Sequence, residues 1–117
     1  MKLKSRPTMR SKKHYVIFRL HYGDPEFRPD FMNVRGAIWN SLESWLGEAE
    51  AAKANIRFIM NLWDPKTQTG FLSCSPKYVD KIKVAMALVH QIGDQRVIVQ
   101  VLRVSGTIKS GKEKAKL

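Results

Sequence analysis

The sequence has little cysteine and no long apolar run. Cys74 is the single cysteine in 117 residues, so no disulfide can form within the chain, and we expect a reducing, cytoplasmic location. No stretch approaches the roughly 20 apolar residues that a membrane span requires. Residues 1–13 lack the apolar segment of a signal peptide. We therefore expect neither a disulfide-stabilised scaffold nor a membrane protein, and we predict no membrane partner.

The sequence also lacks an arrangement of catalytic or metal-binding residues. His14, His21 and His90 lie far apart and have no neighbouring ligands at metal-site spacing. Cys74 has no evident base, and a small buried strand residue is the better interpretation. Nothing assembles a nucleophile, a base and an oxyanion stabiliser. We therefore expect neither catalytic residues nor a metal or cofactor bound by this chain.

One motif near the end of the chain resembles a nucleotide-binding loop. Gly106, Gly111 and Lys112 match the spacing G-x-x-x-x-G-K. The next residue is Glu113, where such a loop needs Ser or Thr for Mg²⁺, and its charge would repel phosphate. Too few residues follow to form the helix whose N-terminus binds phosphate. The spacing therefore does not predict a nucleotide site.

Positive charge is present in excess and is unevenly distributed. The chain carries a net charge of +11, of which residues 1–13 contribute +6 and residues 103–117 contribute +4. The remaining residues contribute only +1. Basic arms of this kind are typical of nucleic-acid contacts, because each neutralised phosphate releases counterions. The alternative is a pair of solvated tails without a binding role.

Periodicity and turn signals predict six main elements. Apolar and polar residues alternate in several β-rich runs, while other segments show the three- and four-residue spacing of helices with capping residues at Asp30 and Ser75. Residues 48–54 are predicted to add a short helix. The predicted strands cover residues 14–22, 56–63, 69–75 and 95–104, and the predicted helices cover residues 31–47 and 76–92.

The element order β-α-β-β-α-β predicts an α+β, ferredoxin-like sandwich. It has a four-stranded antiparallel sheet with both helices on one face, plus short extra helices. We expect one domain over residues 1–117, divided into a basic arm (1–13), a core (14–104) and a basic tail (105–117). The other sheet face contains apolar residues, so it is predicted either to bind a partner or to be covered by the termini or by residues 48–54.

The same fold serves RNA readers of the RRM type, which stack bases on aromatic residues of the two central strands. Here Tyr15 and Phe18 point to opposite faces of the first predicted strand, and the third strand reads Gly70, Phe71, Leu72 without the basic and aromatic pattern. Base stacking on the sheet is therefore disfavoured. If the protein binds RNA, we expect the arms to hold its backbone.

Four segments together resemble the archaeal ribonuclease P protein component 2 family. They are MRSKKHYVIF (9–18), AIWNSLESWLGEAEAAKANIRFI (37–59), TQTGFLSCS (67–75) and VIVQVLRVSGTIK (97–109). The resemblance covers nearly the whole chain in the right order, and SGTIK after the last strand is its most specific part. Two positions depart from the family pattern: Ser73 stands where relatives often have a basic residue, and a second glycine near Glu50 is missing.

The resemblance implies an RRM-like protein subunit of ribonuclease P. Such a subunit binds and stabilises a catalytic RNA that removes 5′ leaders from precursor tRNA, with Mg²⁺ held by the RNA. Its implied partners are ribonuclease P RNA, precursor tRNA indirectly, and ribonuclease P protein component 3 in a heterotetramer around a component 2 homodimer. The implied RNA-binding residues are Arg10, Lys12, Lys13, Arg103, Ser105, Lys109 and Lys112.

Two other function classes stay open at this point. One is a non-enzymatic basic RNA-binding module, such as a ribosomal protein of the same fold. The other is a ferredoxin-like regulatory domain for a small ligand. If the protein restores cleavage by ribonuclease P RNA at low Mg²⁺, this would distinguish the ribonuclease P hypothesis from both alternatives.

Overall fold

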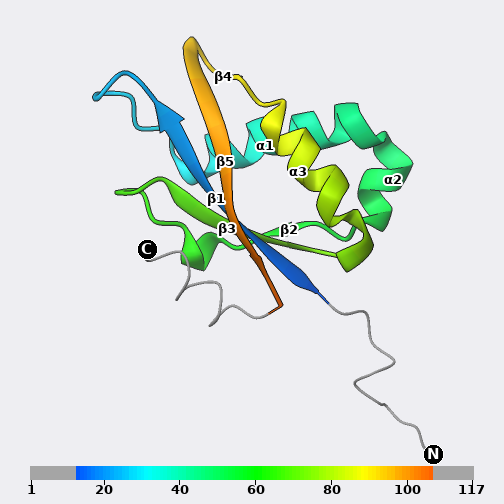
Figure 1. The fold of residues 1–117 in the computed structure, drawn as a ribbon. Helices are drawn as coiled ribbons and strands as arrows, with labels where there is room; N and C mark the ends of the chain where they lie inside the picture. The colour runs from blue at the N-terminus through cyan, green and yellow to red at the C-terminus, as the bar shows by residue number, and fades with distance from the viewer. Residues whose placement is uncertain (1–12, 107–117) are drawn as a thin grey trace, which may run out of the picture.

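A computed structural model describes residues 13–106 as an antiparallel sheet with helices on one of its faces (Figure 1). No helix in this part of the chain is long and apolar enough to cross a membrane. The strands are β1 (His14–Tyr22), β2 (Arg57–Phe58), β3 (Thr69–Cys74), β4 (Gln91–Ile92) and β5 (Gln95–Ser105). The helices are α1 (Phe31–Leu46), α2 (Glu48–Lys53) and α3 (Val79–Ala87), with 3-10 turns η2 (Met60–Leu62) and η3 (Pro76–Tyr78).

The strand order β2-β3-β1-β5-β4 places β1 at the centre of the sheet. It pairs antiparallel with β3 on one side and with β5 on the other. This is the predicted ferredoxin-like order with one additional strand at the edge. The alternation predicted for β1 is also present, because Val16, Phe18 and Leu20 face the helices and are almost fully buried.

Helix α1 begins and ends at the residues that the sequence predicts. The Asp30 carboxylate accepts a hydrogen bond from the backbone N–H of Asn33, which is the N-cap interaction expected of an aspartate at this position. Gly47 follows the last turn at φ 85°, a left-handed value that glycine adopts without a Cβ clash. The buried face of the helix is formed by Val34, Ile38 and Leu42.

The core lies between the sheet and the helical layer. From α3 it receives Ile82, Ala85 and Met86, and after α2 it receives Ala54, none of which is exposed. Because α2 contacts α1 in the helical layer, the alternative that residues 48–54 cover the opposite sheet face is wrong. Cys74 is buried in this core, and burial raises the pKa of its thiol to about 11, so the thiol stays protonated.

The second predicted strand, residues 56–63, is much shorter than its composition indicates. Only Arg57 and Phe58 pair with β3, after which the chain turns into η2. The Ile59 N–H still bonds to the Phe71 carbonyl, but the turn then carries Met60 away from the sheet and leaves it exposed. β-rich composition predicts fit to a half-buried surface and does not fix where pairing stops.

The second predicted helix is also shorter, and the sheet has a fifth strand that the sequence analysis missed. Helix α3 ends at Ala87, and Gln91–Ile92 then pairs with Gln95 and Arg96. Gly93 and Asp94, interpreted as a helix stop, are instead the two-residue turn of a β-hairpin. Gly93 has the positive φ (60°) that this turn requires. A two-residue strand has no periodicity from which it could be predicted.

Gly70 is required by the packing of an aromatic ring. It lies opposite Phe18 on β3. A Cβ at this position would lie 2.7 Å from Cζ of Phe18 and 3.0 Å from Cε3 of Trp63. The missing side chain therefore provides the space in which the buried Phe18 ring packs across the neighbouring strand.

A polar cluster joins α2 to the start of α3. The Tyr78 hydroxyl donates a hydrogen bond of 2.9 Å to Oε1 of Glu50, and Lys53 Nζ lies 3.5 Å from Oε2 of the same carboxylate. Lys77 and Lys81 lie over the Tyr78 ring, with each Nζ within 6 Å of the ring centroid. The hydrogen bond from Tyr78, and secondly the charge of Lys53, lower the pKa of Glu50 below its usual 4.5.

We predict that Gly70→Ala destabilises the fold by roughly 1–3 kcal/mol, because the new methyl group overpacks against two aromatic rings. Urea unfolding measures the change. The matched control is Gly23→Ala, where a Cβ would meet nothing within 4 Å, and its free energy of unfolding should change by no more than about 0.5 kcal/mol. Equal stability of the two variants would show that the Phe18 ring does not depend on Gly70.

We predict a pH-dependent difference in stability between the wild-type protein and Glu50→Gln. Because the folded-state pKa of Glu50 is lowered, its contribution is present above the unfolded-state pKa of about 4.3 and is lost as pH falls through the folded value. Thermal unfolding from about pH 7 to pH 3 should show wild type more stable at the upper end and the two melting temperatures converging at the lower end. A gap that persists at the lowest pH would contradict a charge-based contribution.

Candidate nucleic-acid interface

The strands carry positive side chains and no carboxylate. The five strands together contain four charged residues other than histidine, and all four are arginines: Arg19, Arg57, Arg96 and Arg103. Every Asp and Glu in the described residues 13–106 lies outside the five strands. The strands therefore present positive charge without carboxylates beside it, whereas the helices also carry Glu43, Glu48, Glu50 and Asp80.

Strand register places all four arginines on the face away from the helices, which we call the arginine face. Arg57 precedes the core-facing Phe58, and Arg96 precedes the buried Val97. Arg19 lies between the buried residues of β1, and its Nε donates a hydrogen bond of 3.0 Å to Oγ1 of Thr69. This bond holds one guanidinium against the sheet, while the other three arginine residues are exposed.

A β-bulge is the reason that Arg103 belongs to this face. Ile17 pairs with Arg103 and Phe18 pairs with Val101, so Leu102 is an extra residue in β5. Simple alternation from Val99 and Val101 would turn Arg103 toward the core. The extra residue reverses the alternation and places Arg103 beside Ile17, while Val104 returns to the core side.

Three of the predicted RNA-binding residues come together at one end of the sheet. Lys13 is exposed immediately before β1, and Tyr15 in that strand pairs with Ser105 at the end of β5. Arg103 is exposed two residues before Ser105, whereas Ser105 itself is buried and is not available as a free surface contact. The other predicted residues lie outside the described residues: Arg10, Lys12, Lys109 and Lys112.

Sequence analysis missed Arg57 as a candidate site residue. Its partner Ser73 in β3 pairs with Tyr15 in β1, which pairs with Ser105 in β5. Arg57 therefore lies in the same row across four strands as the predicted residues. β2 lies three strands away from β5, and Arg57 reaches the row of Ser105 only through the strand order and register. No local sequence pattern could therefore identify it.

The arginine face has little aromatic surface for base stacking. Phe71 lies at its centre opposite Ile17, but only 5% of Phe71 and none of Ile17 is exposed. Tyr15 is half-buried at the edge of this pair. This arrangement agrees with the prediction that stacking is disfavoured, and it suits contacts to phosphates, which position a nucleic acid without reading its bases.

The two basic segments of the chain adjoin the sheet at the same end. Because β1 and β5 are antiparallel neighbours, the start of β1 and the end of β5 lie side by side. Residues 1–13, with a charge of +6, and residues 103–117, with a charge of +4, are therefore joined to the sheet at the same place. In the described part of the chain no three His, Cys, Asp or Glu side chains are grouped closely enough to hold a metal ion. The arrangement favours binding of a polyanion.

Comparison with known proteins gives relatives over the whole folded region. The Ribonuclease P protein component 2 of Pyrococcus abyssi is 40% identical over 115 residues, covering 97% of this chain and 93% of the relative. That of Thermococcus gammatolerans is 41% identical, covering 92% and 86%. That of Archaeoglobus fulgidus is 33% identical, covering 92% of each.

A solved structure supports the fold independently of sequence identity. One chain in the cryo-EM structure of yeast Ribonuclease MRP superposes with a TM-score of 0.66 and covers 92% of this chain and 94% of the yeast chain, at 13% identity. At that identity the match establishes the shared fold and nothing beyond it. The profile of the Rpp14/Pop5 family, "RNase_P_Rpp14", matches residues 14–116. The chain therefore belongs to the Rpp14/Pop5 family.

Proposed function

We propose that this chain is a protein subunit of ribonuclease P that binds and stabilises the catalytic RNA during removal of 5′ leaders from precursor tRNA. The observation that carries the proposal is the arginine face, joined at one end to both basic segments of the chain. The relatives that match most of its length are ribonuclease P protein component 2 sequences, and this supports the assignment. The proposal places the protein in the cytoplasm with an RNA partner.

In this proposal the protein contributes no reacting group. Folding an RNA into a catalytic core brings phosphates close together, and cations near them lower the repulsion between them. Arg57, Arg96 and Arg103 can serve in this way because a guanidinium binds phosphate through two parallel hydrogen bonds and is always charged. Mg²⁺ on the RNA phosphates supplies the chemistry of cleavage.

The proposal also names the specific protein partner of the chain. As implied by the resemblance, we propose that the chain assembles with ribonuclease P protein component 3 as a heterotetramer around a component 2 homodimer, and that it meets precursor tRNA only through the complex. An uncharged surface on the helical side, where Met32, Trp45 and Leu88 are exposed, supports a protein partner there.

The first test measures how RNA affinity depends on salt. If Arg57 and Arg103 each contact a phosphate, the double variant Arg57→Gln, Arg103→Gln should flatten the plot of log affinity against log salt by roughly 1.4–1.8 units, at ~0.7–0.9 per contact. Binding to ribonuclease P RNA is measured at four salt concentrations for wild type and variant.

The matched control is Lys53→Gln, Lys83→Gln, which removes the same charge from exposed positions on the helical side. It should leave the slope within about 0.3 units of wild type. Equal slopes for wild type and the arginine variant would refute a phosphate-binding role for the arginine face, even if the variant bound more weakly.

The second test distinguishes a ribonuclease P subunit from a general basic RNA-binding module. We predict that wild-type protein together with component 3 allows ribonuclease P RNA to cleave precursor tRNA at a Mg²⁺ concentration where the RNA alone is inactive. The arginine double variant should require more Mg²⁺ than wild type. Tight RNA binding without any rescue of cleavage would favour the alternative, a basic module of ribosomal-protein type.

A further inference from the structure

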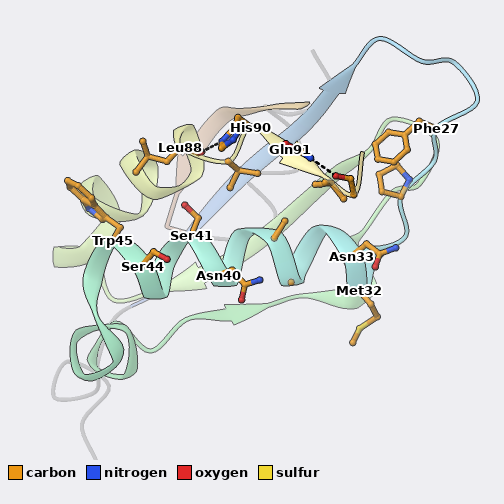
Figure 2. A pocket seen from close by; sticks show the side chains of 16 residues that line it. Phe27, Met32, Asn33, Asn40, Ser41, Ser44, Trp45, Leu88, His90 and Gln91 are labelled. Carbon is orange, nitrogen blue, oxygen red and sulfur yellow. Dashed lines mark hydrogen bonds between the residues drawn. The ribbon is translucent and has the colours of Figure 1, made fainter. Parts of the chain in front are cut away.

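A groove of about 830 Å³ runs along the helical side of the molecule, away from the arginine face (Figure 2). One wall is the length of α1, and the other is the segment from the end of α3 through β4. Phe27 lies near one end of the groove and Trp45 near the other, with Leu88 across from Trp45. None of its lining residues contributes to the site described above.

The groove contains no charged residue in a strongly charged protein. Its sixteen lining residues include no Asp, Glu, Lys or Arg, although these make up 26% of the chain. Met32, Trp45 and Leu88 are 50–60% exposed along it, and they are three of the six large apolar side chains that stand exposed in the described residues. The centres of protein–protein interfaces are likewise poor in charged residues and rich in Trp and Met.

Three of the six polar side chains on the groove walls are hydrogen-bonded within the chain. The Ser41 hydroxyl donates to the Ala85 carbonyl, and His90 Nδ1 donates to the Leu88 carbonyl at 3.2 Å. Gln91 Nε2 donates to the Gly93 carbonyl at 2.7 Å. A partner that covers these walls therefore leaves these groups satisfied, so an apolar contact surface can dock without stranding them.

Gly36 is a second and independent indication that something approaches the groove closely. It lies inside α1, where glycine is a poor helix former. A Cβ at Gly36 would meet nothing within 4 Å, and its φ is not positive, so the folded chain gives no reason for glycine there. Because Gly36 lines the groove, the missing side chain would allow the backbone of a bound partner to come near the helix.

The shape and charge of the groove select one kind of occupant. An RNA backbone requires cations, and the groove has none. In a two-fold symmetric dimer formed through the same patch, each groove would face the groove of the other copy, and neither would be filled. Strand addition needs a long free edge, whereas β4 has only two residues. The groove follows α1 from Asn33 to Trp45, which at 1.5 Å per residue spans about 18 Å.

We propose that this groove binds an α-helix of about three turns from another protein subunit, which presents a convex, uncharged and apolar stripe to α1. Close approach of that helix at Gly36 and burial of the Trp45 and Leu88 side chains provide the contact. This inference deepens the proposed function and rests on it, since the partner is a subunit of the same ribonucleoprotein.

The decisive variant is Gly36→Glu, which places a carboxylate in the groove without harming the fold. The new side chain has open space, and replacing a mid-helix glycine improves helix propensity, so the melting temperature should stay equal or rise by a few degrees. Binding to ribonuclease P protein component 3, measured by calorimetry without RNA, should weaken at least about 100-fold, because a charge is buried without a partner. Trp45→Ala should weaken it roughly 30-fold.

The matched control is Ala52→Glu, which adds the same charge at an exposed position of α2 outside the groove and should bind component 3 like wild type. RNA affinity of Gly36→Glu, measured separately, should stay within about twofold of wild type, since added negative charge far from the arginine face has a weak effect. Failure of wild type to bind RNA would refute the proposed RNA-binding function, and failure of wild type to bind component 3 would refute the proposed partner. The ratio of component 3 affinity between wild type and Gly36→Glu tests the groove alone.

Four outcomes would overturn the inference. The first is failure of wild type to bind component 3, and the second is binding of component 3 by Gly36→Glu as tight as that of wild type. A large loss of RNA affinity in Gly36→Glu with component 3 binding intact would make the groove an RNA surface. Sedimentation of the chain alone that shows a dimer for wild type and a monomer for Gly36→Glu would identify a second copy as the occupant.

Discussion

The simultaneous pairing of β1 with β3 and β5 is the interaction on which the rest of the structure depends. Because β1 is hydrogen-bonded along both edges, each of its side chains must serve one of two surfaces. Val16, Phe18 and Leu20 are committed to the helical core. The alternate residues, including Arg19, are thereby committed to the opposite face, and the positions of Arg57 and Arg103 follow from their registers with this strand and its neighbours.

The fold separates two kinds of binding surface by the thickness of a sheet and a helical layer. Cations without carboxylates gather on the sheet, while an uncharged groove lies among the helices. In the proposed assignment of the two surfaces, their separation lets one small domain bind RNA and protein at the same time without competition between the two. It also keeps the apolar contact away from phosphates, where uncharged surface would be of little use.

Sequence reasoning succeeded where the signal is local and failed where it depends on register. The limits of α1 follow from Asp30 and Gly47, which act through neighbouring backbone groups, and the burial of Cys74 follows from its place in an apolar run. The two-residue strand β4, the early end of β2 and the bulge at Leu102 have no such signal. Arg57 and the groove were missed for the same reason, since both are created by segments that meet only in three dimensions.

The packing of Phe18 over Gly70 has a consequence for how this sequence can change over time. A residue larger than glycine at position 70 collides with the ring, and a residue smaller than phenylalanine at position 18 leaves a void in the core. Each single step therefore lowers stability, while a joint exchange of volume between the two strands conserves the filled space. Substitutions at the two positions therefore depend on each other, although the positions are 52 apart along the chain.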